Sequence, residues 1–157
     1  LAQLSQDLSD RRIHRSYLTI VAGCPEAPKG TIEAPIGRSR RARTKMTVTE
    51  DGREARTHYE LLETWRHPTQ ASLLKCTLDT GRTHQIRVHL RAINCPVLGD
   101  STYGKKDPFG IGRPLLHSAE ISFHHPLSQE EMNFVCAPPA DFNEALSGFR
   151  AQNPEDS

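Results

Sequence analysis

The sequence lacks a long hydrophobic run: none approaches the roughly 20 apolar residues that span a bilayer, and no secretory signal peptide is recognisable. We therefore expect no membrane association. Cysteines are few and scattered, with no CxxC pair among Cys24, Cys76, Cys95 and Cys136. This pattern disfavours a disulfide framework and is typical of reduced thiols in a cytoplasmic protein.

Metal-binding spacings are also missing. The chain contains eight histidines, but none stands in a pattern such as HExxH, and His124 and His125 are adjacent rather than periodic. The sequence therefore predicts no metal site.

No charge of one sign dominates, because 20 Lys and Arg face 19 Asp and Glu and leave a formal net charge of +1. That balance is not typical of a nucleic-acid-binding domain. The distribution is uneven, however, and residues 37–45 carry five cations, namely Arg38, Arg40, Arg41, Arg43 and Lys45. This run is either a solvated, mobile loop or a surface that binds the phosphate backbone of RNA.

Alternation of apolar and polar residues predicts one α+β domain, a largely antiparallel mixed β-sheet flanked by a few helices. Ser16–Gly23 is apolar on both faces, which favours a central strand. Gly30–Ile36 is a further strand candidate, and Ala71–Asp79 alternates like a half-buried strand. Phe142, Leu146 and Phe149 have the spacing of one face of a helix, which predicts a helix near the end of the chain. Ala151–Ser157 is expected to be a frayed polar tail.

The stretch Thr80–Leu90 follows the last predicted strand of the meander. Its pattern favours a short helix with Thr83 as N-cap, ending near Asn94, although a strand also fits Ile86, Val88 and Leu90. The apolar face of the helix would consist of Ile86, Leu90 and Ile93.

Three cationic or titratable residues of this stretch, Arg82, His84 and Arg87, would cluster at the helix N-terminus. The backbone there already presents positive potential, so cations need an anion nearby, either a carboxylate or a phosphate. The alternative is a solvated basic face with Arg87 in an ordinary ion pair.

These residues also carry a resemblance. Thr80-Gly81-Arg82-Thr83-His84-Gln85-Ile86-Arg87, followed by Gly99-Asp100-x-x-Tyr103-Gly104, is similar to the third conserved motif of the RluA-type RNA pseudouridine synthases. His14–Gly23 resembles the second motif of that family, a strand with a functional tyrosine. Arg113–His117 and Phe123–Pro126 resemble the segments that follow the third motif, so the resemblance covers nearly the whole chain.

The resemblance implies a partial pseudouridine synthase-like catalytic fold that isomerises uridine in RNA without a cofactor. Ribosomal RNA is favoured over transfer RNA as the partner. The family's first motif, similar to His-Arg-Leu-Asp, supplies a catalytic aspartate, and this sequence does not contain it. We expect residues 1–150 to be the larger, C-terminal part of such a domain and 151–157 a tail. Leu1, Leu4 and Leu8 have the spacing of a helix already under way, which suggests a truncated chain that is inactive alone.

Roles follow from the resemblance residue by residue. Tyr17 would pack its ring on a flipped uracil and use its hydroxyl in proton transfer, whereas its spacing alone favours a core aromatic. Arg87 would pair with the missing aspartate, and Ile86 would form an apolar wall. Contacts to phosphate or base edges are implied for Arg82, His84 and Gln85.

Three neighbouring features are interpreted as structural. Asp100 would shape the turn before Tyr103, His117 would be a satisfied structural histidine, and Lys105–Pro114 would be a mobile loop that could cover the substrate. Two other functions remain open: a non-catalytic RNA-binding module on the same scaffold, and a small interaction domain without RNA. The sequence makes no prediction of oligomeric state.

Overall fold

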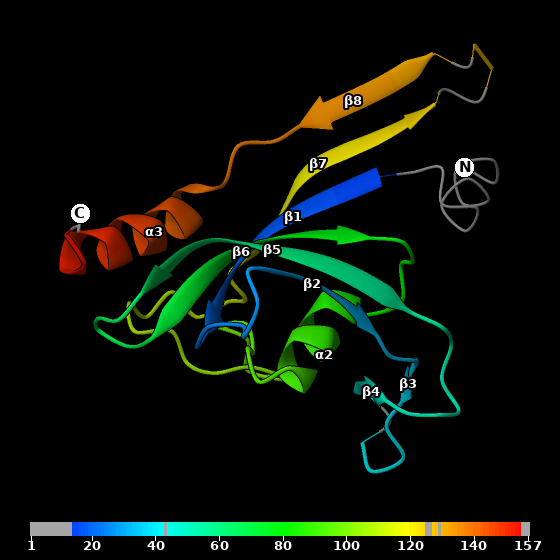
Figure 1. The fold of residues 1–157 in the computed structure, drawn as a ribbon, viewed down its shortest axis with the longest axis horizontal. Helices are drawn as coiled ribbons and strands as arrows, with labels where there is room; N and C mark the ends of the chain where they lie inside the picture. The colour runs from blue at the N-terminus through cyan, green and yellow to red at the C-terminus, as the bar shows by residue number, and fades with distance from the viewer. Residues whose placement is uncertain (1–13, 43, 125–126, 129, 155–157) are drawn as a thin grey trace.

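The computed structural model describes residues 14–42, 44–124, 127–128 and 130–154. Within these ranges the predicted α+β architecture is confirmed: a six-stranded antiparallel sheet of order β2-β5-β6-β1-β7-β8, a separate two-stranded hairpin and two helices (Figure 1). The elements are β1 (His14–Ala22), β2 (Lys29–Glu33), β3 (Ile36–Arg38), β4 (Met46–Val48), β5 (Arg56–Trp65), β6 (Ala71–Leu78), α2 (Gln85–Ala92), β7 (Leu116–His124), β8 (Glu131–Val135) and α3 (Ala140–Gln152).

Strand β1 lies at the centre of the sheet, between β6 and β7, as its two apolar faces predicted. Its side chains alternate between two cores that lie on opposite faces of the sheet, under α2 and under α3 (Figure 1). The core under α2 contains Val21, Ile32, Leu74, Cys76, Ile86, Leu90, Cys95 and Val97. The core under α3 contains Ile20, Trp65, Ala71, Leu73, Leu98, Leu115, Phe142, Ala145, Leu146 and Phe149. The predicted apolar face of α2 and the predicted helix near the C-terminus are thus confirmed.

Two predicted boundaries are wrong. The strand expected over Gly30–Ile36 is divided into β2 and β3, since Pro35 has no N–H to donate to a neighbouring strand. Helix α3 continues to Gln152, so Ala151 and Gln152 are helical rather than part of a tail. Asn153 ends the helix by donating to the carbonyl of Phe149 and accepting from the backbone N–H groups at 66 and 67. The expectation for Leu1, Leu4 and Leu8 lies outside the described residues.

The loop Lys105–Pro114 is not the free flap that its glycines and prolines suggested. The buried carboxylate of Asp107 accepts hydrogen bonds from the backbone N–H groups of Phe109, Ile111 and Gly112, at 2.9, 3.0 and 3.1 Å. The Phe109 ring also packs edge-on against Phe149 of α3. The Asp107 bonds hold the loop in one conformation, and Phe109 and Ile111 pack it against the core under α3.

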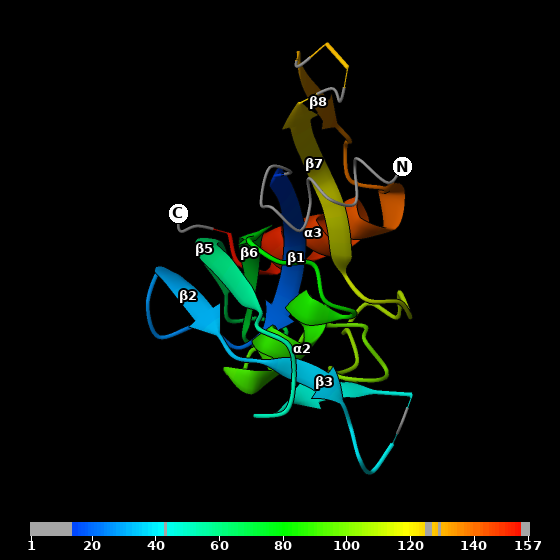
Figure 2. The ribbon, with the colours of Figure 1, turned by 90° about the vertical axis from the view of Figure 1, so that its right-hand side faces the viewer.

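Hairpin β3–β4 extends from one end of the molecule, and the long ribbon β7–β8 extends from the other (Figure 2). The root of the hairpin packs on the helix α2 side, in a cluster that contains Ile36, Met46, Ala55, Val88 and Tyr103. His117 of β7 bonds through Nε2 to the carbonyl of Cys136, so its ring has a hydrogen-bond partner. No helix in the described part of the chain is long and apolar enough to cross a membrane.

Candidate active site

A pocket of about 270 Å³ opens between the start of α2 and strand β1. All six residues predicted to be catalytic or substrate-binding line it: Tyr17, Arg82, His84, Gln85, Ile86 and Arg87. The remaining lining residues are Arg15, Leu78, Gly81 and Leu116. Segments that are about 65 residues apart in the sequence are thus brought to one cavity, because β1 pairs with β6 and α2 follows β6 directly.

Tyr17 and Ile86 provide the apolar part of the lining. Tyr17 is half-buried at the edge of the core under α2, and Ile86 is buried in that core. Arg15 lies two residues before Tyr17 on the same face of β1 and donates from Nη1 to the Tyr17 hydroxyl at 3.2 Å. The sequence reasoning gave Arg15 no role, although the spacing of two along a strand would have placed it beside Tyr17.

The start of α2 differs from the prediction, because His84 and not Thr83 is the N-cap. His84 adopts a left-handed conformation, with φ of 56° and ψ of 26°, and its side chain makes no capping bond. The Gln85 side chain instead holds the preceding loop. Its Oε1 accepts from Thr80 Oγ1 and from the N–H of Arg82, while its Nε2 donates to the carbonyl of Arg56 and to Thr57 Oγ1. The oxygen of the Gln85 amide thus accepts two hydrogen bonds and its nitrogen donates two, and these four bonds position the loop.

Arg87 forms an ion pair with a carboxylate of this chain, which is the ordinary ion pair that the sequence left open as an alternative. Nε and Nη2 donate to the two oxygens of Asp100, at 2.7 and 2.9 Å. The Asp100 side chain is 0% exposed and that of Arg87 is 20% exposed. Among the described residues no hydrogen bond leaves Nη1 of Arg87, so this edge of the guanidinium is left for the pocket.

Asp100 also shapes the turn that follows it, as predicted. Its Oδ1 accepts from the backbone N–H groups of Thr102 and Tyr103. Burial alone would raise the pKa of the Asp100 carboxyl, but the Arg87 guanidinium and the two N–H groups outweigh burial and lower that pKa below its usual value. The turn needs Gly104, since a Cβ there would lie 1.9 Å from the carbonyl oxygen of Val97.

His84 is tied to the same turn. Its Nδ1 lies 2.8 Å from the hydroxyl of Tyr103, and burial together with the Arg87 charge lowers the pKa of His84. The third residue of this group, Arg82, donates from Nε to the carbonyl of Glu54. This bond uses Nε, so the Nη N–H groups of Arg82 are the donors that it can offer at the pocket rim.

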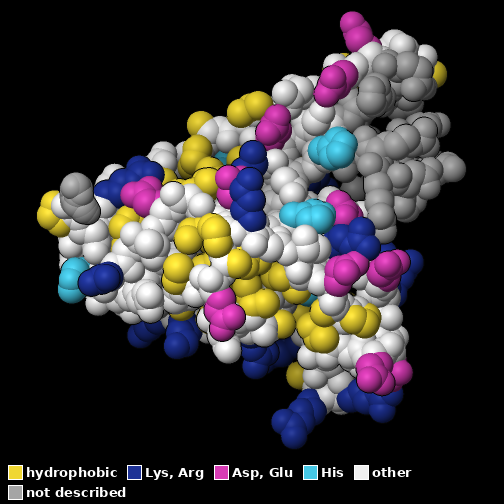
Figure 3. Space-filling model, viewed as in Figure 1, with side chains coloured by type: hydrophobic (Ala, Val, Ile, Leu, Met, Phe, Trp, Pro, Cys, Tyr) yellow, Lys and Arg dark blue, Asp and Glu magenta, His cyan; other side chains and the backbone are white. Residues whose placement is uncertain are grey.

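The basic run lies apart from the pocket, at the tip of hairpin β3–β4, where Lys and Arg side chains gather at the lower edge of Figure 3. Arg38, Arg40, Arg41 and Lys45 are exposed, and Arg43 lies outside the described residues. Arg40 pairs with Asp51 on the surface. The Ser39 hydroxyl accepts from the backbone N–H groups at 41 and 42, which gives residues 39–42 a defined turn.

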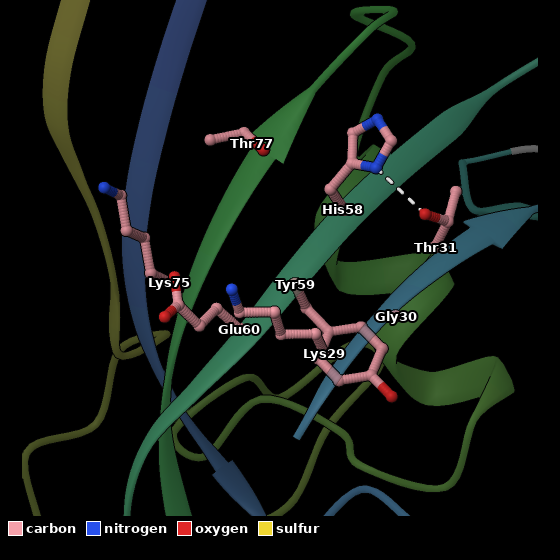
Figure 4. A pocket seen from close by; sticks show the side chains of 8 residues that line it. All are labelled: Lys29, Gly30, Thr31, His58, Tyr59, Glu60, Lys75 and Thr77. Carbon is pink, nitrogen blue, oxygen red and sulfur yellow. Dashed lines mark hydrogen bonds between the residues drawn. The ribbon is translucent and has the colours of Figure 1, made fainter. Parts of the chain in front are cut away.

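A larger cavity, of about 450 Å³, lies over β2, β5 and β6 and contains none of the predicted site residues. Figure 4 shows the Glu60 carboxylate between the side chains of Lys29 and Lys75, its neighbours on the two adjacent strands. His58 is bonded to Thr31 and, through Nε2, to Asp79. Among the described residues no group of three or more His, Cys, Asp or Glu side chains could hold a metal ion.

The profile of the RNA pseudouridylate synthase family matches residues 1–92, more than half of the chain. The chain belongs to this family. An uncharacterized RNA pseudouridine synthase of Bacillus subtilis is 39% identical over 147 residues, which cover 94% of this chain and 48% of that protein. Ribosomal large subunit pseudouridine synthase D of Xanthomonas campestris is 39% identical over 160 residues, covering 94% of this chain and 47% of the relative. The chain spans about half the length of the curated relatives it matches.

A solved structure shares the fold. Human RNA pseudouridylate synthase domain containing 1 superposes with a TM-score of 0.75 at 26% identity, over 92% of this chain and 63% of the human one.

Proposed function

We propose that the natural protein containing this chain isomerises uridine to pseudouridine in structured RNA, and that ribosomal RNA is its substrate rather than transfer RNA. One observation carries the proposal: Tyr17, Ile86 and Arg87, which the family resemblance singles out, line a single pocket. The choice of ribosomal RNA is supported by the Xanthomonas campestris relative, whose name assigns it to the large ribosomal subunit.

The reaction breaks the bond between uracil N1 and ribose C1′, turns the base and joins C5 to C1′. The proton lost from C5 is balanced by the one gained at N1, so atoms and electrons balance within the substrate and no cofactor is required. The target base must leave its stack to enter a pocket. Tyr17 would then lie against the uracil face, its hydroxyl would move a proton, and Ile86 would exclude water from the apolar side.

Arg87 would hold the catalytic aspartate, which this sequence does not contain. Asp100 already binds the Nε–Nη2 edge of the guanidinium and fixes its plane, and the Nη1 edge remains to bind a second carboxylate. Such a charge-assisted bond keeps a carboxylate ionised and oriented. We propose that the aspartate comes from chain outside these 157 residues, so that this chain alone is inactive.

The other predicted residues would have different roles according to where they lie. Arg82 and His84 would contact the target nucleotide from the pocket rim, whereas Gln85 would position the loop. Arg38, Arg40, Arg41, Arg43 and Lys45 would contact phosphates through the hairpin. A cytoplasmic location stays a prediction.

The test is conversion of uridine, measured by mass spectrometry of nuclease-digested RNA after incubation with the natural protein in EDTA. We expect pseudouridine at discrete positions of ribosomal RNA, none in transfer RNA, and none from residues 1–157 alone. RNA that stays unmodified would overturn the proposal. If that RNA were nonetheless bound, with an affinity that falls steeply with salt and less steeply after alanine replaces the hairpin cations, the chain would be a non-catalytic RNA-binding module.

A further inference from the structure

Tyr103 stands where three parts of the molecule meet. It is 4% exposed, its backbone N–H donates to Asp100, and its ring lies under the Arg87 guanidinium, 4.9 Å from Cζ to the ring centroid. Its hydroxyl makes hydrogen bonds to two other parts of the molecule. It lies between the backbone of β4 and the imidazole of His84.

One of the two hydrogen bonds of this hydroxyl has a direction fixed by its partner. The N–H of Met46 donates to the Tyr103 oxygen at 2.8 Å. A phenol has one proton, and among the described residues Nδ1 of His84, also at 2.8 Å, is placed to receive it, which would satisfy both groups; we infer that direction for the second bond. Nδ1 is then the acceptor nitrogen, so the neutral ring carries its proton on Nε2.

The surroundings of His84 keep it neutral. Arg87 and Asp100 face it from α2 and from the turn, and the pocket adds the cations of Arg15 and Arg82 and the hydroxyl of Tyr17. Burial is the larger cause of its lowered pKa and the Arg87 charge the next, while Asp100 opposes both. A neutral imidazole with its proton on Nε2 is a hydrogen-bond donor there.

On its other side the hydroxyl holds the root of the basic hairpin. Met46 is the first residue of β4 and pairs with Arg38, the last residue of β3, so the bond to Tyr103 lies where the basic loop leaves the paired strands. The ring itself packs in the cluster with Ile36 and Val88. One hydroxyl thus touches both the hairpin and the pocket.

We propose that Tyr103 is a positioning residue that joins the basic hairpin to the pocket and sets the tautomer of His84, which presents an Nε2–H donor to an acceptor oxygen of the target nucleotide. The inference deepens the proposed function and rests on it for the identity of that nucleotide. The hydroxyl link itself is independent of any activity and is tested separately.

The test of the link is Tyr103→Phe, which keeps the ring under Arg87 and removes only the hydroxyl. Nitrogen-15 NMR of the wild-type imidazole is expected to show His84 with unprotonated Nδ1 and protonated Nε2. In the variant we expect a mixture of tautomers and an exchange of the Met46 amide about tenfold faster. The control is Tyr59→Phe, because the described residues show no hydrogen bond from the Tyr59 hydroxyl, which lies beside Gly30 (Figure 4). If either the tautomer or the Met46 exchange is unchanged in Tyr103→Phe, the link is wrong.

The role of His84 is tested by RNA affinity. His84→Ala is compared with wild type on a stem-loop RNA with one loop uridine, and on the same RNA with that base removed. A weaker affinity only for the uridine RNA assigns the Nε2–H to a carbonyl of the base, and an equal weakening on both RNAs assigns it to a phosphate. Unchanged affinity on both would remove the donor role while leaving uridine isomerisation to be judged by the conversion assay.

Discussion

Arg87→Ala in the natural protein is expected to lower pseudouridine formation by about 10²–10³-fold or more, because it removes the group proposed to orient and ionise the catalytic carboxylate. RNA affinity should change little, since the Arg87 side chain is only 20% exposed and lines the pocket, whereas the hairpin carries the exposed cations. The measurements are single-turnover conversion of uridine and the dissociation constant for the same RNA.

Two controls separate this effect from unfolding. Arg87→Lys keeps the positive charge but cannot bind two carboxylates through a planar fork, so it should lose most of the activity while retaining the fold by circular dichroism. Alanine replacement of Arg40, an exposed hairpin cation, should do the reverse and weaken binding more than turnover. Parallel loss of turnover and RNA affinity in Arg87→Ala would contradict the ion-pair role.

Asp100→Ala should cost about 3–5 kcal/mol of the free energy of unfolding, the range observed when one partner of a buried ion pair is removed. The substitution leaves Arg87 without its buried partner and also removes the acceptor for the N–H groups of Thr102 and Tyr103. Chemical denaturation of the 157-residue chain measures the change.

Asp141→Ala is the matched control, because Asp141 forms a similar two-bond pair with Arg113. Those side chains are 35% and 43% exposed, so the loss should be about 1 kcal/mol or less. If the two variants lost similar free energies of unfolding, the burial of Asp100 would not explain the contribution of its ion pair to stability.

The same pair predicts an acid-sensitive contribution to stability. The pKa of Asp100 is lowered in the fold, so the unfolded chain binds more protons in the interval below its usual value of 3.8. The contribution is therefore complete above about pH 4 and is lost as the pH falls through the folded-state pKa. The Asp100→Ala variant should lack this part of the pH dependence.

Features with a strong sequence period were predictable. The two apolar faces of β1 placed it in the centre of the sheet, and the spacing of Ile86, Leu90 and Ile93 defined the buried face of α2. The family motifs then named six residues that the fold brings to one pocket. The first two predictions depend on residues that are close in sequence. The third depends on the family resemblance, which implies which distant residues share a site.

Features set by one long-range hydrogen bond were not predictable. The turn at Asp100 was predicted, but no local pattern shows that this turn, 13 residues after Arg87, returns to α2 and brings its carboxylate to the guanidinium. The glycines near Phe109 suggested mobility, but one buried carboxylate, Asp107, holds three backbone N–H groups. The Gln85 side chain likewise accepts a hydrogen bond from a backbone N–H group of the loop before α2, so Thr83 is not needed as an N-cap.

The central claim is that the pocket between β1 and α2 receives the target uracil. Photo-crosslinking with ribosomal RNA that contains 4-thiouridine, followed by mass spectrometry of the linked peptides, tests it most directly. The account predicts crosslinks to Tyr17 or Ile86 that disappear when unlabelled RNA competes. Crosslinks confined to residues 38–45 of the hairpin, with none in the pocket, would contradict it.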